Sequence, residues 1–440
     1  MKVAFSTLGC RVNVYESEAM AEKFIREGYE VVEASEKADV YVINTCTVTN
    51  MGDKKSRQII NRARRLNENS IIAVVGCYSQ IAPKEVSEIP GVDVVLGTRN
   101  KGDVVYYVNK ARDEGKSQVH VEGVLKNKKF EELNIGWFFY IGGNDSMDTV
   151  SKLSRYAEHI GSSIRVIGEP KTIDNDLVHT DHTPGFGSAA KYVASTVREI
   201  TTDANVYEKK SVTIIEIMGR HAGWLTAASA LARKYDGDNP LFIYLPEVAF
   251  DQDVFLKDLE KAFEKNCNLI VCVSEGIHDA DGTFICEYDS SVGTDTFGHK
   301  MLAGCGKYLE NLVRSRLGVK ARSVELNVSQ RCSASLISAT DQKEAITAGK
   351  FGVQAALNGE TGKMVSFIRQ TDSEGNYQMV CGLEDVNAIC NEEKTVPLTW
   401  ITSDGHDVTE DFIRYARPLI QGNIEVPLGE DGLPKFVYRK

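Results

Sequence analysis

The sequence predicts an α/β fold in which two unrelated parallel-sheet parts are joined near residue 135. Short apolar runs alternate with amphipathic helical segments along the chain, which is the pattern of a parallel sheet covered by helices. The charge balance also changes along the chain. Residues 1–134 carry 20 basic and 19 acidic side chains, which leaves 31 of the 51 basic and 43 of the 62 acidic residues for the second part. Such a shift indicates two origins or two partners.

The composition is ordinary for a globular protein. Of the 440 residues, 42% are hydrophobic and 26% are charged. No run of about 18 apolar residues predicts a membrane span, and the opening MKVAFSTLGC lacks the long apolar core of a signal peptide. The ten cysteines are scattered, without a secreted disulfide pattern, so we expect a reducing, cytoplasmic setting.

The first part is expected to alternate strands and helices from its first residues. Lys2–Leu8 is an apolar strand, and Glu16–Glu27 is a helix with Met20 and Phe24 on one face. The other predicted strands are Tyr29–Glu33, Asp39–Cys46, Ile71–Gly76 and Asp93–Gly97, and the other helices are Lys54–Leu66 and Val104–Arg112. Residues 113–134 are polar and charged, which predicts a linker or a fraying edge.

The second part starts abruptly with Trp137–Gly143, a predicted buried strand that runs into a glycine turn and the helix Ser146–His159. Further strands are expected at Ser163–Ile167, Val212–Met218, Leu241–Leu245, Leu269–Ser274 and Arg322–Asn327. Long helices are expected at Ala222–Lys234, Gly298–Leu317 and Asp341–Asn358. This order again predicts a parallel sheet.

Three cysteines in the first part each stand where an apolar strand runs out. Cys10, Cys46 and Cys77 end the segments STLGC, VINTC and AVVGC. The carboxyl ends of parallel strands lie along one edge of a sheet, where ligand sites form. Three thiolates there can hold three irons of a [4Fe–4S] cluster and leave one iron open. Spacing alone favours the alternative, which is three buried and inert cysteines.

The sequence segments around these cysteines favour the cluster over inert cysteines. GCRVNVYESEAM, INTCTVTNMGDKKSRQIINRARR and GCYSQIAP resemble the N-terminal domain of the tRNA methylthiotransferases that modify threonylcarbamoyladenosine. The resemblance covers residues 1–134 and implies that Cys10, Cys46 and Cys77 ligate an auxiliary [4Fe–4S] cluster. The C-x3-C-x2-C motif of the radical-SAM domain, which that family needs next, is absent from this sequence. We therefore expect cluster binding without methylthiolation.

A basic stretch in the first part raises the question of RNA binding. It consists of Lys54, Lys55, Arg57, Arg62, Arg64 and Arg65. Such side chains can contact RNA phosphates. Without an aromatic platform nearby, a solvated helix face is the favoured interpretation, and we expect no tRNA contact.

Polar residues in the second part follow successive strands. The Gly-Gly turn of Gly142–Ser146 opens a helix, where a phosphate is favoured. Pro170–Asp176 offers one carboxylate to take a hydroxyl proton and another to sit near a metal. Further strands are followed or bracketed by Met218-Gly219-Arg220, Glu275, Arg322 and Gln330-Arg331. Each segment alone is explained by turn chemistry or a surface ion pair, but together they predict an anionic sugar-phosphate site.

At these residues a second resemblance is clear. GGNDSMDT, PKTIDND, EIMGRHAGWL, SEG and QRCSAS, in this order, resemble 6-phosphofructokinase over residues 135–440. The resemblance implies a two-lobed fold, fructose 6-phosphate as substrate, Mg²⁺ as cofactor, and Asp174 as the base at the sugar 1-hydroxyl, supported by Thr172 and Asp176. It implies that the sugar phosphate is held by Met218, Gly219, Arg220, Glu275, Arg322 and Arg331. Arg322 is expected to come from a neighbouring subunit, so we expect a homo-oligomer.

The phosphoryl donor follows from two positions. ATP-using relatives have glycine where Asp145 and Lys171 stand, because an acidic side chain at 145 crowds the α-phosphate and an ammonium at 171 meets diphosphate instead. The resemblance therefore predicts diphosphate rather than ATP. The donor site is expected to comprise Gly142, Gly143, Asn144, Asp145 and Lys171. The sequence departs from the family at Asn144, where many relatives have aspartate, and at Val328, where some have histidine.

The family's opening segment, with a further Gly-Gly phosphate loop, is replaced here by the methylthiotransferase-like part. We expect its loss to leave Trp137–Gly143 with an unpaired apolar edge, which is an aggregation hazard. The sequence leaves three hypotheses of function open. They are a phosphofructokinase-derived protein whose turnover suffers from the lost loop, an iron–sulfur binding module, and an artefactual fusion without joint function.

Overall fold

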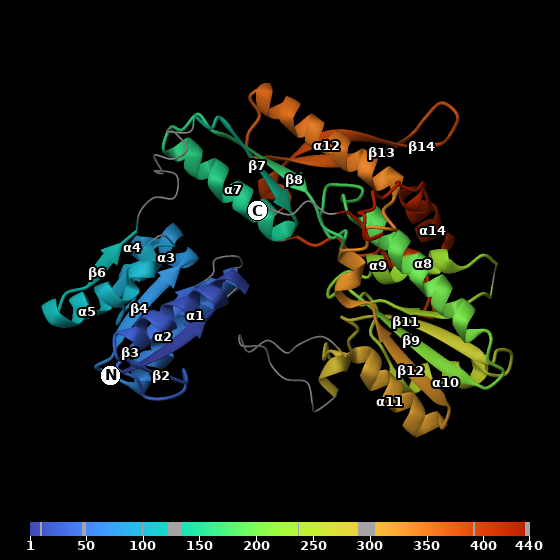
Figure 1. Ribbon diagram of the computed structural model, residues 1–440, viewed down its shortest axis with the longest axis horizontal. Coiled ribbons are helices and arrows are strands. Elements are labelled where there is room, and N and C mark those ends of the chain that lie inside the picture. Colours follow the sequence, from blue (N-terminus) through green and yellow to red (C-terminus); the bar gives the residue numbers. More distant parts are fainter. Residues whose placement is uncertain are drawn as a thin grey trace. The chain divides into compact units, whose positions relative to one another are not determined.

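The computed structural model describes residues 1–8, 11–45, 50–98, 100–121, 134–235, 237–288, 304–389 and 392–435, without the side chains at 11–15, 50–56, 77 and 81. The chain forms two compact units that divide between Ile135 and Gly136 (Figure 1). Each unit is built on parallel strands with helices on both faces. The predicted α/β class is therefore confirmed.

The first unit contains one sheet of six parallel strands in the order β2-β1-β3-β4-β5-β6. These strands are β1 (Lys2–Thr7), β2 (Glu30–Val32), β3 (Val40–Thr45), β4 (Ile71–Gly76), β5 (Val94–Leu96) and β6 (Gln118–His120). The expected linker at 113–134 is wrong at its start, because β6 lies within it. This edge strand has only three residues, which is too short for an alternation of apolar and polar residues to be recognised in the sequence.

Helices cover both faces of this sheet because its central strands are apolar on both sides. Val40 and Val42 pack with one set of helices, and Tyr41 and Ile43 pack with the other. The first set is α1 (Arg11–Arg26) and α5 (Val104–Glu114), and the second is α2 (Asn50–Leu66), α3 (Cys77–Ile81) and α4 (Pro83–Ser87). Since α1 follows β1 and α2 follows β3 on opposite faces, the connections diverge at the carboxyl ends of these two neighbouring strands.

The second unit contains two four-stranded sheets, ordered β10-β11-β9-β12 and β14-β13-β8-β7. All neighbouring strands are parallel except β13 and β14, which form an antiparallel pair. The strands are β7 (Trp137–Gly142), β8 (Arg165–Pro170), β9 (Ser211–Ile217), β10 (Phe242–Tyr244), β11 (Asn268–Ser274), β12 (Lys320–Glu325), β13 (Lys363–Thr371) and β14 (Tyr377–Asp385). The predicted parallel arrangement is thus confirmed for most of this unit.

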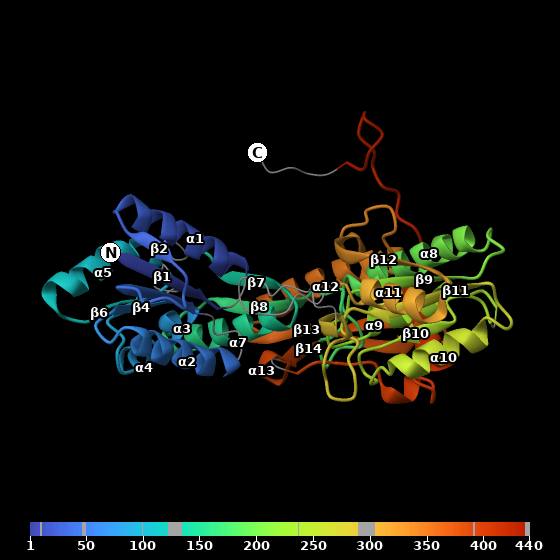
Figure 2. The same cartoon turned by 90° about the horizontal axis from the view of Figure 1, so that it is seen from below.

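Helices also cover both faces of each of these sheets (Figure 2). They are α7 (Asn144–His159), α8 (Phe186–Ala204), α9 (Trp224–Ala227), α10 (Gln252–Ala262), α11 (Cys305–Leu317), α12 (Ala339–Leu357), α13 (Val386–Ile389) and α14 (Glu410–Ala416). On the first sheet, α8 packs on one face while α10 and α11 pack on the other. On the second, α7 and α13 share one face and α12 covers the other. No described helix is long and apolar enough to cross a membrane.

Two predicted helices differ from the structure. The expected helix Ala222–Lys234 is wrong, because only the short α9 forms there and continues as a 3₁₀ turn at Ala228–Ala232. That run is buried on all sides, so tertiary packing rather than a helical period sets its geometry. The helix expected at Gly298–Leu317 begins at Cys305 within the described residues.

The strand β7 lies at the end of its sheet. Among the described strands it pairs only with β8. Trp137 and Ile141 are 49% and 67% exposed on it. The strand predicted to be apolar therefore forms, last in the strand order of its sheet and with exposed apolar side chains.

Candidate active site

The loops that carry the predicted donor and catalytic residues meet at the carboxyl ends of β7 and β8. The Lys171 amide donates to the Gly142 carbonyl at 2.9 Å. A Cβ atom built on Gly143 lies 3.6 Å from Cβ of Thr172, so the two loops are in close contact there. The predicted donor turn therefore lies directly beside the loop that carries Asp174.

The loop after β8 is organised around a turn at Asn175. The Asp174 amide donates to Oγ1 of Thr172 at 3.1 Å, and that hydroxyl lies 3.3 Å from the Asp174 carboxylate. Asn175 is fully buried and has a φ of 55°, in the left-handed region that few residues other than glycine adopt. Its side-chain amide donates to the Tyr415 hydroxyl at 2.9 Å. This buried turn fixes where the carboxylates of Asp174 and Asp176 emerge.

Both carboxylates have raised pKa values. Burial raises the pKa of Asp174, and the nearby charges of Arg331 and Lys171 act against that rise. Burial raises the pKa of Asp176 to about 6, and the charge of Asp174 adds to the effect. Groups with pKa values near neutrality can exchange protons at physiological pH, which suits general acid–base chemistry.

Backbone amides of the loop after β9 donate hydrogen bonds to side chains of neighbouring loops. The Met218 amide donates to Oε1 of Gln330 at 3.2 Å, and the Gly219 amide donates to Oε1 of Glu275 at 3.3 Å. Gly219 has a φ of 141°, and a Cβ atom there would lie 2.6 Å from the Ala222 carbonyl oxygen. Only glycine fits this position without a shift of the backbone.

The predicted sugar-phosphate residues largely belong to one electrostatic group. Burial raises the pKa of Glu275, the negative charge of Asp174 adds to that rise, and the positive charges of Arg220 and Arg331 oppose it. Arg331 also acts on Asp174. The structure thus brings Glu275 against the Gly219 amide, and the charges of Asp174, Arg220 and Arg331 act on its carboxyl group.

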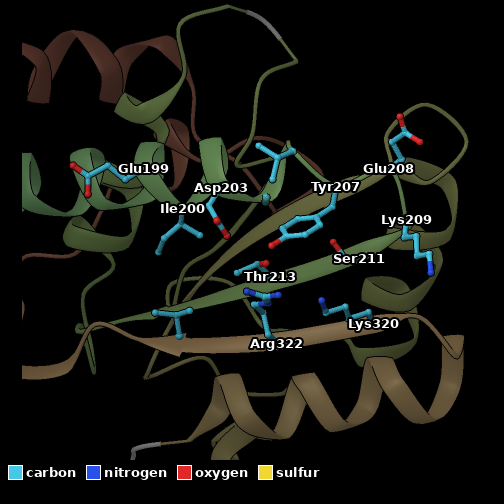
Figure 3. A pocket seen from close by; sticks show the side chains of 13 residues that line it. Glu199, Ile200, Asp203, Tyr207, Glu208, Lys209, Ser211, Thr213, Lys320 and Arg322 are labelled. Carbon is cyan, nitrogen blue, oxygen red and sulfur yellow. The ribbon is translucent and has the colours of Figure 1, made fainter.

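Arg322 does not join this group within one chain. It stands opposite Thr213 in the β9–β12 pairing, five residues before Met218, which is roughly 16 Å along the strand. Arg322 lines a different cavity of about 770 Å³ between α8, β9 and β12, where it lies on the side of β12 that faces Tyr207 (Figure 3). The charged residues of this cavity are Glu199, Asp203, Glu208, Lys209, Lys320 and Arg322.

The donor turn is acidic on the side of α7. Burial raises the pKa of Asp145, and the charges of Asp148 and Glu393 add to the rise. The side-chain amide of Asn144 donates to the Glu392 carbonyl at 2.6 Å. Asn144 is therefore held by a segment near the C-terminus that the sequence patterns did not single out.

The predicted cluster ligands follow neighbouring strands of the first unit. β1, β3 and β4 are adjacent and parallel, and they end at Thr7, Thr45 and Gly76. Cys10 and Cys46 lie outside the described residues, as does the side chain of Cys77. Among the residues that are described, no three His, Cys, Asp or Glu side chains are placed to hold a metal ion.

Two arginines of the basic stretch on α2 are engaged within the first unit. Arg57 pairs with Glu85 at 2.5 Å. Arg64 donates to the Ser70 carbonyl at 2.9 Å and pairs with Asp93 at 3.1 Å. These contacts give the two guanidinium groups a structural role within the first unit.

Comparison with protein families gives two matches. A model described as Phosphofructokinase matches residues 51–356, and one described as Uncharacterized protein family UPF0004 matches residues 2–97. The Pyrophosphate--fructose 6-phosphate 1-phosphotransferase of Xanthomonas campestris is 42% identical over 309 residues, 70% of this chain and 73% of that protein. Its counterpart in Methylococcus capsulatus is 38% identical over 333 residues, 73% of this chain and 78% of that protein.

The first unit has other relatives. The Threonylcarbamoyladenosine tRNA methylthiotransferase MtaB of Bacillus subtilis is 49% identical over 136 residues, which are 31% of this chain and 30% of that protein. The MtaB protein of Aquifex aeolicus is 40% identical over 139 residues, 32% of this chain and 34% of that protein. The chain thus covers about a third of these methylthiotransferases, which confirms the predicted fusion of two families.

Solved structures give the same fold. The pyrophosphate-dependent phosphofructokinase of Nitrosospira multiformis matches with a TM-score of 0.63 and 32% identity, over 73% of this chain and 78% of that one. The enzyme of Marinobacter aquaeolei matches with a TM-score of 0.62 and 27% identity, over 100% of this chain and 98% of that one. With a family model that covers more than half of its residues, the chain belongs to the phosphofructokinase family, and its N-terminal part is of the MtaB type.

Proposed function

We propose that the chain transfers a phosphoryl group from diphosphate to the 1-hydroxyl of fructose 6-phosphate. The observation that carries the proposal is the grouping of Asp174, Glu275, Arg220 and Arg331 at the carboxyl ends of separate strands. Relatives with 42% and 38% identity are named for this reaction. In-line phosphoryl transfer depends mainly on positioning and on stabilisation of charge, and this group supplies both.

Each residue has a definite part in the proposed reaction. Asp174 accepts the proton of the sugar 1-hydroxyl, and the hydroxyl of Thr172 orients its carboxylate. Asp176 supports Asp174 from the same turn, two residues further along the chain. The sugar phosphate is held by Met218, Gly219, Arg220, Glu275 and Arg331, with Arg322 from a second copy of the chain. Arg322 lines a cavity that contains none of the other proposed site residues, which supports its use by a neighbouring copy of the chain.

The donor site is proposed to favour diphosphate over ATP. Gly142, Gly143 and Asn144 form the turn, Asp145 occupies the side where an α-phosphate would lie, and Lys171 supplies a positive charge. Asp176 fits a role beside Mg²⁺, because its Oδ1 atom is buried and has no hydrogen-bond partner among the described residues. When bound, Mg²⁺ would neutralise the phosphoryl oxygens.

Turnover assays with two donors test the proposal. We expect fructose 1,6-bisphosphate to form from fructose 6-phosphate with diphosphate and Mg²⁺, and not with ATP. The double variant Asp145→Gly with Lys171→Gly should lose the preference for diphosphate, whereas Lys191→Met, on α8, should keep it. Turnover by the wild type with ATP alone would refute the donor assignment, and no turnover with either donor would reduce the chain to a sugar-phosphate binding protein.

A second function is favoured by the adjacency of β1, β3 and β4. We propose that the first unit binds a [4Fe–4S] cluster through Cys10, Cys46 and Cys77, since each follows one of these neighbouring strands. Anaerobic reconstitution should produce the thiolate-to-iron absorbance band. Serine at the three positions should remove the band, whereas Cys267→Ser, an exposed free cysteine of the second unit, should leave it. A band that survives the triple change would refute the assignment.

We further propose that residues 1–134 and 135–440 are the two functional domains. The division of the structure between Ile135 and Gly136 supports this boundary. Sequencing of the source DNA across codons 125–145 tests the remaining hypothesis of an artefactual fusion. An interrupted reading frame there would identify the junction as an artefact.

A further inference from the structure

One short segment near the C-terminus, Glu392–Val396, contacts the donor turn, the Asp174–Asp176 turn and the chain that follows β9. We call it the bridging segment. The side-chain amide of Asn144 in the donor turn donates to the Glu392 carbonyl at 2.6 Å. The Lys394 amide donates to the Asp176 carbonyl at 2.7 Å, and the Trp224 indole N–H donates to the Lys394 carbonyl at 2.8 Å. The segment therefore links the donor turn, the Asp174–Asp176 turn and the loop after β9.

A carboxylate strengthens the connection on the sugar side. Oε1 of Glu247 accepts the Gly223 amide at 2.8 Å and the Val396 amide at 2.8 Å. One acceptor thus joins the end of the bridging segment to the loop that carries Met218–Arg220. Because both bonds end on one charged group, they are stronger than neutral hydrogen bonds.

The side chain of Lys394 contacts the turn at Asn175 directly. Its ammonium group donates to the carbonyls of Thr180 at 3.0 Å and Asp181 at 2.8 Å, and lies 3.4 Å from Oδ1 of Asn175. These three acceptors match the three donors of an ammonium group. The same ammonium lies 5.3 Å from the centre of the Trp224 ring, within the range of a cation–π contact.

The contact with Asn175 is the important one, because that residue stands between the two carboxylates. Its amide nitrogen donates to the Tyr415 hydroxyl, and its amide oxygen faces Lys394. Both ends of the amide are therefore held, while the backbone keeps a left-handed φ of 55°. A left-handed non-glycine residue costs free energy and persists only where its surroundings hold it.

Lys394 also contributes charge to the site. The charged groups that act on Asp176 are Asp174 and Glu393, which raise its pKa further, and Lys394, which lowers it. Burial, opposed by the charges of Asp181 and Asp176, lowers the pKa of Lys394 to about 8. At neutral pH the ammonium is therefore present and favours the ionised form of Asp176.

We propose that Lys394 is a positioning residue for phosphoryl transfer, whose ammonium group fixes the Asn175 turn and with it the carboxylates of Asp174 and Asp176. The inference rests on the proposed function and adds to it a residue that touches no substrate. It predicts that loss of the ammonium affects the chemical step more than the binding of the sugar.

The test compares Lys394→Met with the matched variant Lys191→Met in the full-length chain. The ammonium of Lys191 is held by similar acceptors outside the site, donating to the Ile337 carbonyl at 3.1 Å and to Oδ1 of Asn423 at 2.7 Å. We expect Lys394→Met to lower kcat by about 100-fold, the usual effect of a small misplacement, with KM for fructose 6-phosphate little changed. Lys394→Arg should recover part of kcat, and Lys191→Met should lose little.

Rescue by the conservative variant separates positioning from a general loss of stability. Lys394→Arg keeps a cation near the same carbonyl groups, so it should recover part of kcat even if it is no more stable than Lys394→Met. Thermal unfolding of the two methionine variants shows whether they are destabilised alike. Equal kcat values for Lys394→Met and Lys191→Met would overturn the inference, while the proposed function would stand.

A wild type without turnover would remove the proposed function, and the inference then has its own readout. In protein with ¹⁵N-labelled asparagine, the side-chain amide signal that is lost in Asn175→Asp identifies that residue. We expect Lys394→Met to shift this signal and Lys191→Met to leave it in place, because the Asn175 amide oxygen faces Lys394. An unchanged Asn175 signal in Lys394→Met would overturn the inference without any assay of activity.

Discussion

The residues of the candidate site differ in how their charges are controlled. Asp174 and Asp176 are separated only by Asn175. Burial raises the pKa of both carboxyl groups, and the negative charge of Asp174 raises the pKa of Asp176 further. Arg331 and Lys171 oppose this for Asp174, and Lys394 opposes it for Asp176. Each carboxylate thus has its own cation, which allows the two to take different roles.

The role of Asp174 gives a direct prediction. Asp174→Asn keeps the shape of the side chain but cannot accept the hydroxyl proton. We expect kcat with diphosphate to fall by about 10²- to 10⁴-fold, the usual contribution of a general base, while the equilibrium affinity for fructose 6-phosphate is kept. Initial rates and calorimetric binding measure the two quantities. Asp411→Asn, at an exposed position on α14, is the control, and equal rates for both variants would contradict the role.

A second cluster of buried charged residues lies beside the Asp174–Asp176 turn. The His182 ring is 1% exposed, and its two nitrogens lie 2.8 Å from the carboxylates of Asp181 and Glu344. Arg369 holds the same Asp181 carboxylate through two hydrogen bonds of 2.9 Å. The two carboxylates outweigh the effect of burial, so the pKa of His182 is raised, and Asp181 has its pKa lowered to about 2.

These shifts determine how the free energy of unfolding depends on pH. The pKa of His182 is higher in the folded chain than its ordinary value of 6.5, so its contribution is complete below that pH and is lost as the pH rises through the folded value. We expect His182→Gln to lower the free energy of unfolding by about 1–3 kcal/mol near pH 5 and by less near pH 9. Urea titrations of wild type and variant at both pH values measure this. A larger loss at the alkaline pH would contradict the raised pKa.

At the level of secondary-structure elements, the edge strand β7 is expected to promote self-association of the protein. This strand is last in the order of its sheet and pairs only with β8 among the described strands, and it exposes the apolar side chains of Trp137 and Ile141, which favours pairing with another strand. We expect Ile141→Lys to reduce aggregation, because a lysine on an edge strand opposes such pairing. Stability should change by less than about 0.5 kcal/mol, since Ile141 is already 67% exposed.

Light scattering during slow heating measures this effect. Val254→Lys is the matched control, because Val254 is 48% exposed but lies on the helix α10. If the two lysine variants aggregate to the same extent, the edge of β7 is not responsible. A reduction confined to Ile141→Lys would identify it as the site of association.

At the level of the whole molecule, the two units have separate hydrophobic cores. Phe24 is fully buried in the core of the first unit, and Phe255 is fully buried in the second. We expect Phe24→Ala and Phe255→Ala each to destabilise one unit by about 3–5 kcal/mol, which is typical of a large cavity. Calorimetry of the full chain should show two transitions, each variant lowering a different one. A common shift of both transitions in either variant would contradict separate folding.

Much of the fold and of the candidate site was predictable from local patterns. Apolar runs ended where β4, β9 and β11 end, and the polar motifs stood directly after them, because the carboxyl end of a strand and its loop are adjacent in sequence. The helix α8, the hairpin β13–β14 and the short strand β6 were not predicted, because no polar motif or apolar run of this kind marks them in the sequence. The sequence predicts one long helix at Ala222–Lys234, because alanine favours helices, but the structure forms the short α9 followed by a 3₁₀ turn.

The sequence by itself determined the two families, the parallel sheets and the residues that follow their strands, because each of these depends on neighbours along the chain. Only the tertiary structure decided which of those residues share a site. Arg322 on β12 lines another cavity, away from the loop that carries Asp174, while Lys394, 218 positions after Asp176, donates its backbone amide to the Asp176 carbonyl. Contacts between residues so far apart in sequence are set by how sheets and loops pack, and packing leaves no periodic trace in the residues themselves.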